Sequence, residues 1–308
     1  MTTSPGLEYT SVRSPRLKAA RRLTKRALRQ RLRAFLVEGP QAVTEAFGSG
    51  APVTELFVTA EARTRHADLV NAMARAGIPV HAVSGEVMAE LAQTVTPQGL
   101  LAVCGFVDIP LEQAVAGGTV AGGTVAGGTV AGGPVAGGPV AGGPVAGDPA
   151  GPPRLAAVLA SVRDPGNAGT VLRTADAAGA QAVIFSDASV DPYNGKCVRA
   201  SAGSLFHLPL VAGVPPERAV SALRAAGMRI LAADARGGRT LDELPSAELA
   251  APTAWIFGNE AWGMPAEVVA LADESVAVPI YGRAESLNLA TAAAVCLYAC
   301  ARAQRAAS

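Results

Sequence analysis

Three short polar segments of this 308-residue chain contain residue types that can hold a ligand and act on it. The first, residues 164–173, reads Asp-Pro-Gly-Asn-Ala-Gly-Thr-Val-Leu-Arg and supplies an amide at Asn167 and a guanidinium at Arg173. Asn167 is also a plausible helix cap. Helical spacing points the arginine away from a packing face that contains Val171, Ala175 and Ala178. The spacing is equally compatible with a site arginine and with a solvated helix arginine.

The second segment, residues 257–264, reads Phe-Gly-Asn-Glu-Ala-Trp-Gly-Met and has a carboxylate between two glycines. Gly258 and Gly263 favour a loop whose backbone wraps around a small ligand, although no phosphate-binding fingerprint is present. Glu260 is a candidate site carboxylate, or else a helix-start residue favoured by the helix dipole. The pattern is weak evidence when taken alone.

The third segment, residues 278–290, reads Val-Pro-Ile-Tyr-Gly, then after three residues Ser-Leu-Asn-Leu-Ala. Ser286 and Asn288 supply a hydroxyl and an amide at the start of a long helix-like run. Both residue types also cap helices, so a purely structural role is open for each.

The elements around these segments predict a fold that brings the segments together. Apolar strands are expected at Leu155–Val162, Ala182–Ser186, Met228–Ala233, Ala254–Phe257 and Ser275–Ile280, with a terminal helix over Ser286–Arg305. Alternating strands and helices predict an α/β domain with a mostly parallel sheet covered on both faces. Each polar segment follows a strand, and ligands bind at the carboxyl ends of parallel strands. We therefore expect one crevice lined by all three segments.

The N-terminal part carries a strong charge asymmetry. Ten of the 26 Lys and Arg residues fall within residues 13–33, which contain no acidic residue, and the remaining 16 basic residues face 25 acidic ones. A basic arm on an acidic body is typical of a nucleic-acid binder, and the alternative is a solvated basic helix. Residues 12–111 otherwise alternate strands and helices, with strands expected at Ala34–Glu38, Val53–Thr59, Ile78–Val83 and Leu100–Val107.

A pentapeptide repeat separates the two parts. From Val115 to Pro149 the chain reads VAGGT three times, VAGGP three times and VAGDP once. The glycines and prolines oppose both helix and sheet, so residues 112–152 are expected to be a flexible linker, with a reach of roughly 35 Å. This linker would allow domains 1–111 and 153–308 to sit apart and to engage one large substrate at two places.

Other sequence features narrow the class of protein. The four cysteines, with no histidine nearby, are expected to be reduced core thiols in a cytosolic protein, and no metal site is predicted. The uncharged run 287–301 is too short to span a bilayer, and the N-terminus lacks the apolar segment of a signal peptide.

These segments together resemble the SpoU (TrmH) family of RNA ribose 2′-O-methyltransferases, in the SPOUT superfamily. NAGTVLR, FGNEAWGM and VPIYG…SLNLATAAAVCLY look like the three family motifs in order, and residues 199–209 look like a further family segment. Residues 14–39 and 96–103 are similar to the substrate-binding domain of rRNA-directed members. Matched together, the motifs are highly specific.

The resemblance implies a C-terminal domain with a deep trefoil knot, a small L30e-like α/β domain that binds the RNA substrate, a homodimer formed through the catalytic domain, and S-adenosyl-L-methionine as cofactor. It implies cofactor contacts from Gly258, Gly263, Val278, Ile280 and Leu287. It places Arg173 at the reacting hydroxyl, with the other polar site residues at Asn167, Glu260, Ser286 and Asn288. A guanidinium stays protonated in proteins, so Arg173 is expected to hold phosphate or developing alkoxide charge, and whether it is the general base stays open.

The basic arm should neutralise RNA phosphates through Arg16, Lys18, Arg21, Arg22, Lys25 and Arg26. The first domain favours large-subunit rRNA, of a housekeeping or an antibiotic-resistance type. The alternatives are a tRNA methyltransferase of the same family and a non-catalytic RNA-binding assembly factor that kept the fold.

Overall fold

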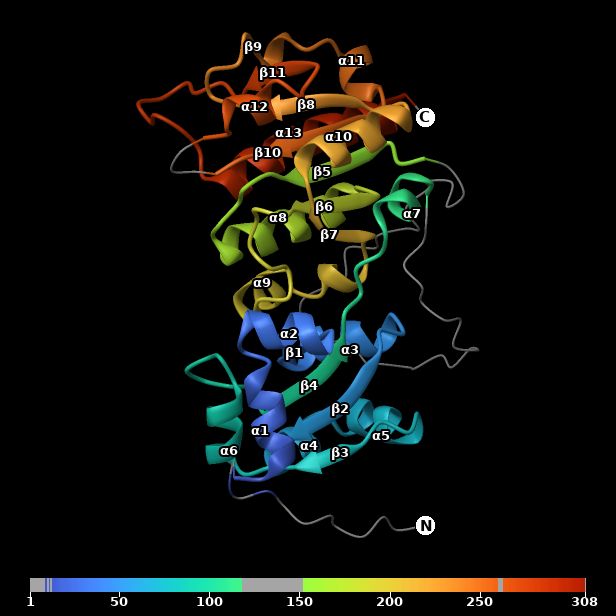
Figure 1. The fold of residues 1–308 in the computed structure, drawn as a ribbon, viewed down its shortest axis with the longest axis vertical. Coiled ribbons are helices and arrows are strands. Elements are labelled where there is room, and N and C mark those ends of the chain that lie inside the picture. Colours follow the sequence, from blue (N-terminus) through green and yellow to red (C-terminus); the bar gives the residue numbers. More distant parts are fainter. Residues whose placement is uncertain (1–8, 10, 12, 118–151, 260–262, 308) are drawn as a thin grey trace.

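In a computed structural model, the chain forms two α/β units stacked along the long axis of the molecule (Figure 1). The structure describes residues 9, 11, 13–117, 152–259 and 263–307. Most of the expected linker, from 118 to 151, lies outside these residues.

The first unit is built on a four-stranded mixed sheet in the order β1-β4-β2-β3. β4 is antiparallel to both β1 and β2, and β3 is parallel to β2. The four expected strands are confirmed as β1 (Ala34–Glu38), β2 (Val53–Val58), β3 (Val80–Ala82) and β4 (Leu100–Gly105).

Alternate side chains of this sheet pack on opposite faces, as the strand period requires. Leu36 and Phe57 face one cluster, and Phe35 and Val58 face the other. The first face is covered by α1 (Pro15–Arg22) and α6 (Gly85–Leu91). The second is covered by α3 (Pro40–Gly48), α4 (Ala60–Arg65) and α5 (Ala67–Arg75), while α2 (Arg26–Leu32) lies toward the second unit.

The second unit is a seven-stranded sheet in the order β7-β6-β5-β10-β8-β11-β9, in which all recorded pairings are parallel. The mostly parallel sheet predicted from the sequence is thereby confirmed. Its strands are β5 (Leu155–Leu159), β6 (Ala182–Ser186), β7 (Leu210–Val214), β8 (Arg229–Ala233), β9 (Arg239–Thr240), β10 (Thr253–Phe257) and β11 (Glu274–Ala277). β5, β6 and β10 are buried throughout because helices cover both faces.

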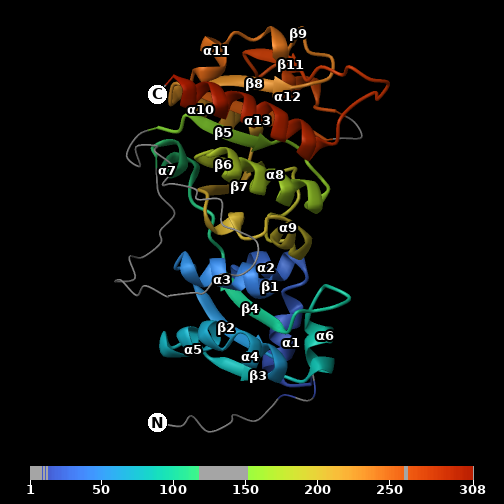
Figure 2. The same ribbon diagram turned by 180° about the vertical axis from the view of Figure 1, so that it is seen from behind.

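The helices of the second unit form two layers. One face carries α8 (Pro165–Ala178), α9 (Gly195–Ala200) and α13 (Leu289–Ala306), and α8 and α13 lie side by side in both views (Figures 1 and 2). The other carries α7 (Leu111–Val115), α10 (Pro216–Ala225) and α12 (Ala266–Val269), and α11 (Ser246–Ala250) packs on α13. Short 3₁₀ turns occupy Ser204–Phe206 and Leu241–Glu243.

The structure differs from the sequence prediction at β7, at the edge strand β9 and at the start of the terminal helix. β7 was not predicted because its short apolar run contains Gly213 and is flanked by Pro209, Pro215 and Pro216. The terminal helix begins at Leu289 instead of Ser286, since Asn288 is its cap. The knot implied by the resemblance stays a prediction.

The linker would allow the two domains to sit apart, but their described residues are in direct contact. Phe35 of β1 packs on Tyr193, with ring centroids 4.7 Å apart, and on Phe206 of the second unit. The Tyr193 hydroxyl accepts hydrogen bonds from the backbone N–H groups of Val107 and Asp108. A continuous apolar cluster therefore joins the units, which linker composition could not reveal.

Candidate functional site

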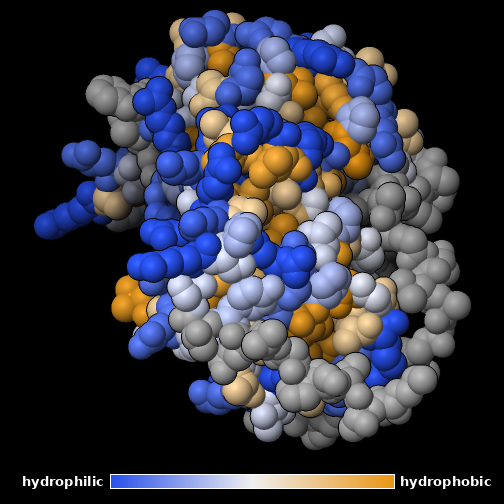
Figure 3. Space-filling view, turned by 60° about the horizontal axis from the view of Figure 1, so that its bottom comes forward, coloured by the Kyte–Doolittle hydropathy of each residue, from blue (hydrophilic) through white to orange (hydrophobic). Residues whose placement is uncertain are grey.

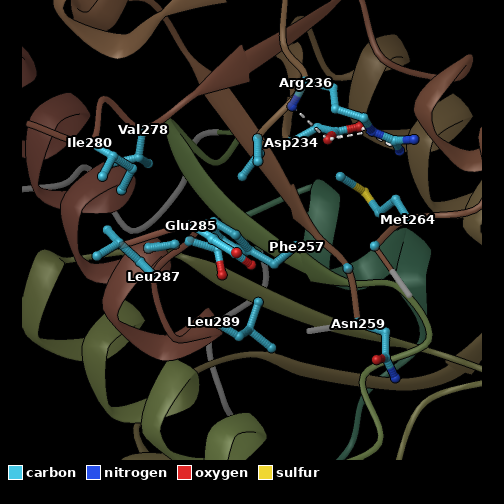
Figure 4. Close-up of a pocket in the computed structure, with 16 residues that line it drawn as sticks. Asp234, Arg236, Phe257, Asn259, Met264, Val278, Ile280, Glu285, Leu287 and Leu289 are labelled. Carbon is cyan, nitrogen blue, oxygen red and sulfur yellow. Dashed lines mark hydrogen bonds and ion pairs between the residues drawn. The ribbon is translucent and has the colours of Figure 1, made fainter. Parts of the chain in front are cut away.

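A pocket of about 380 Å³ opens at the carboxyl ends of β8, β10 and β11 (Figure 4). The crevice expected from the sequence is present for the second and third segments, but no residue of the first segment, 164–173, lines it. Its walls include five residues expected to contact a cofactor and one expected polar site residue: Gly258, Gly263, Val278, Ile280, Leu287 and Ser286. Its volume lies in the range of small-molecule sites, ~300–1,000 Å³.

The two positions of the second segment that hold glycine require it for different local reasons. A side chain at Gly258 would place its Cβ 2.2 Å from the Cγ atom of Met264, so the loop closes on itself only without one. Gly263 has a φ of +71°, which disfavours other residues, and it pairs as an isolated bridge with Asn259. The backbone can thus come close to a ligand here.

Asn167 and Asn288 join the first and third segments. The Nδ2 group of Asn288 donates to Oδ1 of Asn167 at 3.1 Å. The Oδ1 atom of Asn288 also caps α13 by accepting from the backbone N–H groups of Ala290 and Thr291. Asn288 therefore both caps its helix and contacts the first segment.

The expectation that Asn167 caps α8 is wrong. Pro165 occupies the first helical position, so the cap is Asp164, whose Oδ1 accepts from the backbone N–H of Asn167 at 2.8 Å. The side chain of Asn167 is thereby available for Asn288 instead of for its own helix.

Arg173 does not line the described pocket. Arg173 is exposed on α8, on the far side from the packing residues Val171 and Ala175, and it is not part of the pocket lining. Glu260 lies outside the described residues.

A loop after β8 contributes side chains that the sequence prediction missed. Asp234 and Arg236 line the pocket, and the backbone N–H of Arg236 donates to the Asp234 carboxylate at 3.0 Å (Figure 4). Burial opposes ionisation of Asp234, but hydrogen bonds from the backbone and side chain of Arg236 outweigh it and lower the pKa of the carboxyl group. The strand-end argument used for the other three loops also applies here, because β8 was predicted and Asp234 follows it directly.

The expected RNA-binding residues lie on α1, on α2 and on the turn between them, and they divide into two groups. Arg16 contacts His81 and Glu55, and Arg21 pairs with Glu90 at 3.5 Å. The others are exposed, and within the described part of the chain no ion pair is recorded for them: Lys18, Arg22, Lys25 and Arg26.

The four cysteines are buried and unpaired, which confirms the prediction of free core thiols. Burial raises the pKa of Cys104 to about 12 and also raises that of Cys197, so neither is a reactive thiolate at neutral pH. Over the described residues, no helix has the length and apolar character needed to cross a membrane.

Comparison with known proteins adds independent evidence about both units. Residues 154–298 match the model of the SpoU rRNA Methylase family, and residues 14–102 match the MRM3-like substrate binding domain. Over 94% of its length, the chain is 31% identical to the 23S rRNA (guanosine(2553)-2′-O)-methyltransferase RlmP of Bacillus subtilis (strain 168), covering 98% of that protein. The chain belongs to the SpoU methyltransferase family.

Solved structures share both units. An AdoMet-bound rRNA methyltransferase from Sinorhizobium meliloti superposes with a TM-score of 0.74 at 27% identity, over 96% of this chain and 97% of that one. The SpoU methyltransferase AviRb from Streptomyces viridochromogenes, in complex with AdoMet, superposes with a TM-score of 0.73 at 26% identity, over 96% of this chain and 100% of that one.

The pocket residues fit S-adenosyl-L-methionine. Apolar side chains of Val278, Ile280 and Leu287 offer a wall for an adenine ring. The carboxylates of Asp234 and Glu285 offer negative charge to a ligand that carries a sulfonium and an ammonium group.

Proposed function

We propose that this chain methylates a ribose 2′-hydroxyl of large-subunit ribosomal RNA, with S-adenosyl-L-methionine as methyl donor. The observation that carries the proposal is the pocket at the carboxyl ends of β8, β10 and β11, walled by Gly258, Gly263, Val278, Ile280 and Leu287. The SpoU family match and the 2′-O-methyltransferase name of its Bacillus relative support the reaction.

Within this proposal each polar residue has a defined task. The backbone around Gly258, Val278, Ile280 and Leu287 would hold the cofactor, whose sulfonium supplies an electrophilic methyl group. Ser286, Asn288 and Asn167 lie in or beside the pocket and would position the ribose. Glu260 is proposed as a further polar site residue.

Arg173 is proposed as essential through charge, by holding the phosphate next to the target and stabilising the developing alkoxide. Its exposed position outside the pocket suits a group that meets the RNA and not the cofactor.

The domain roles follow the same proposal. Residues 1–111 bind the RNA substrate, 112–152 connect the units and 153–308 carry the catalytic domain. The match of residues 14–102 to a substrate-binding domain supports the first role. Hydrophilic side chains predominate on the left of the face in Figure 3, interrupted by separate hydrophobic patches. The exposed basic residues Lys18, Arg22, Lys25 and Arg26 suit a polyanionic partner. We further propose a cytoplasmic location.

We propose a homodimer that forms through the catalytic domain. Val295 and Tyr298 are three residues apart on α13 and are 39% and 43% exposed. Apolar side chains at this spacing on one helix face favour burial against a second copy.

Two measurements test the proposal. Calorimetric titration with S-adenosyl-L-methionine should show binding, which a non-catalytic assembly factor would lack. Transfer of a tritiated methyl group to separated rRNA and tRNA should label the rRNA, and label on tRNA alone would favour the tRNA alternative.

A further inference from the structure

A second cavity, of about 190 Å³, lies where the two units meet. It is separate from the cofactor pocket and shares no lining residue with it. Side chains and backbone of both units form its walls, among them Arg26, Arg33, Phe106, Asp191, Tyr193 and Gly213.

The charges around this cavity do not cancel. The guanidinium of Arg33 donates to both carboxylate oxygens of Asp108 at 3.1 Å, and the buried Arg29 pairs with Asp191. Arg26 adds a third cation, for which no acidic partner is recorded within the described residues. The lining itself holds Arg26, Arg33, Asp108 and Asp191, and Arg29, which lies outside the lining, neutralises Asp191, so one positive charge remains.

Arg33 and Arg29 are held in position by their surroundings. The guanidinium carbon of Arg33 lies 4.6 Å from the ring centroid of Phe106, and that ring stacks on Tyr193 at 3.8 Å. Arg29 fixes α2 against the second unit, and Arg26 lies one turn before it on the same side of the helix. The Arg33 guanidinium and the backbone of α2 therefore require little ordering when an anion binds.

The cavity and the cofactor pocket lie at the same edge of the seven-stranded sheet. Ser186, Ala212 and Gly213 line it at the carboxyl ends of β6 and β7, and the cofactor pocket lies at the same ends of β8 and β10. Three strand spacings, about 14 Å in total, separate the two along one edge of a parallel sheet. A few nucleotides of single-stranded RNA can cover that distance.

We propose that this cavity binds a backbone phosphate of the RNA strand whose ribose is methylated, a few nucleotides from the target. Arg26 and Arg33 contact the phosphate, since guanidinium groups match its oxygens in pairs. The cavity thus sets the register of the strand relative to the cofactor pocket. This inference rests on the proposed function, because it presumes an RNA substrate.

The test measures binding of transcribed 23S rRNA over a series of salt concentrations. Arg26→Gln and Arg33→Gln are compared with wild type and with Arg31→Gln, which removes the same charge from an exposed position of α2 outside the cavity. Each of the first two variants should lower the slope of log affinity against log salt by about one, with a roughly tenfold loss of affinity at low salt. Arg31→Gln should keep the wild-type slope.

An unchanged slope in Arg26→Gln and Arg33→Gln, or an equal decrease in Arg31→Gln, would overturn the phosphate site. Because Arg33→Gln also removes a contact to Asp108, its thermal unfolding is recorded, and Arg26→Gln alone decides if that variant is unstable. Methyl transfer is assayed in parallel. If the wild-type protein methylates the RNA but the two variants keep its salt slope, only the cavity proposal is refuted. If the two variants lower the slope but the wild-type protein transfers no methyl group, only the proposed function is refuted.

Discussion

The guanidinium of Arg29 and the carboxylate of Asp191 form a 2.7 Å ion pair between the two units, and their side chains are only 3% and 2% exposed. Arg29 also donates to the backbone carbonyls of Leu23 and Thr24, and Asp191 accepts from the backbone N–H of Tyr193. One arginine of the basic arm is therefore part of the domain interface and is not available to RNA.

Removal of one partner of this pair should weaken the docking of the two units. Asp191→Ala leaves a buried guanidinium without its counter-charge and should lower the free energy of unfolding by ~3–5 kcal/mol. Chemical denaturation monitored by fluorescence and circular dichroism measures the change.

The double variant Arg29→Met, Asp191→Leu serves as the control. It removes both charges and should recover much of the lost stability, because well-packed apolar residues replace buried ion pairs at little cost. If Asp191→Ala were as stable as wild type, the pair would not hold the interface.

His207 should make the interface sensitive to pH. Its Nδ1 lies 2.8 Å from Asp176 and its Nε2 lies 3.1 Å from Glu45 of the first unit. The hydrogen bond with Asp176 raises the pKa of His207 to about 9, with burial opposing and Glu45 contributing. Because the folded-state pKa is raised, the stabilisation is full below about pH 6.5 and is lost as the pH rises through about 9.

Comparison of the wild-type protein with His207→Gln isolates the stabilisation that the charged His207 contributes. The wild type should unfold at higher temperature than the variant at pH 6, and the difference should shrink by pH 9.5. A difference that is constant over this range would contradict the charged interaction.

A methyl group at Gly258 should block the cofactor pocket. Its Cβ would meet the side chain and the Cα atom of Met264, so Gly258→Ala should weaken S-adenosyl-L-methionine binding at least tenfold, or ~1.4 kcal/mol. Gly282→Ala is the matched control, because nothing lies within 4 Å of a Cβ at Gly282. Calorimetry that finds equal affinity in both variants would refute this assignment of the pocket.

Asn288 allows the capping role and the site role to be separated. Asn288→Asp keeps a side-chain oxygen for the N-terminus of α13 but removes the donor to Asn167, so stability should hold while methyl transfer falls by roughly fivefold or more. Asn288→Ala should lose both the helix cap and the hydrogen bond to Asn167, and its free energy of unfolding should fall by ~1 kcal/mol. Normal turnover in Asn288→Asp would mean that the residue is only a cap.

Much of this architecture could be predicted from the sequence, because the positions of the strands depend on local patterns. Apolar runs marked β5, β6, β8, β10 and β11, and the topology of parallel strands then implied a shared crevice. The same argument reaches Asp234, although that residue was not singled out.

Other features depend on contacts between distant segments and were not accessible from the sequence. Nothing in the local pattern separates the buried Arg29 from the exposed Arg31, since both belong to one basic helix. The packing of Phe35 on Tyr193 joins residues 158 positions apart, with the repeat segment between them. The cap of α8 was misplaced because Asp164 and Asn167 are both good caps, and Pro165 decides between them.

The central claim is tested most directly by the position of the transferred methyl group on the RNA. Purified protein is incubated with tritiated S-adenosyl-L-methionine and 23S rRNA, and the labelled product is hydrolysed with alkali, which cannot cleave beside a 2′-O-methylated ribose. We expect label in an alkali-resistant dinucleotide, and loss of that label in single-turnover reactions of Arg173→Ala. Label on a base, or near-normal transfer by Arg173→Ala, would contradict it.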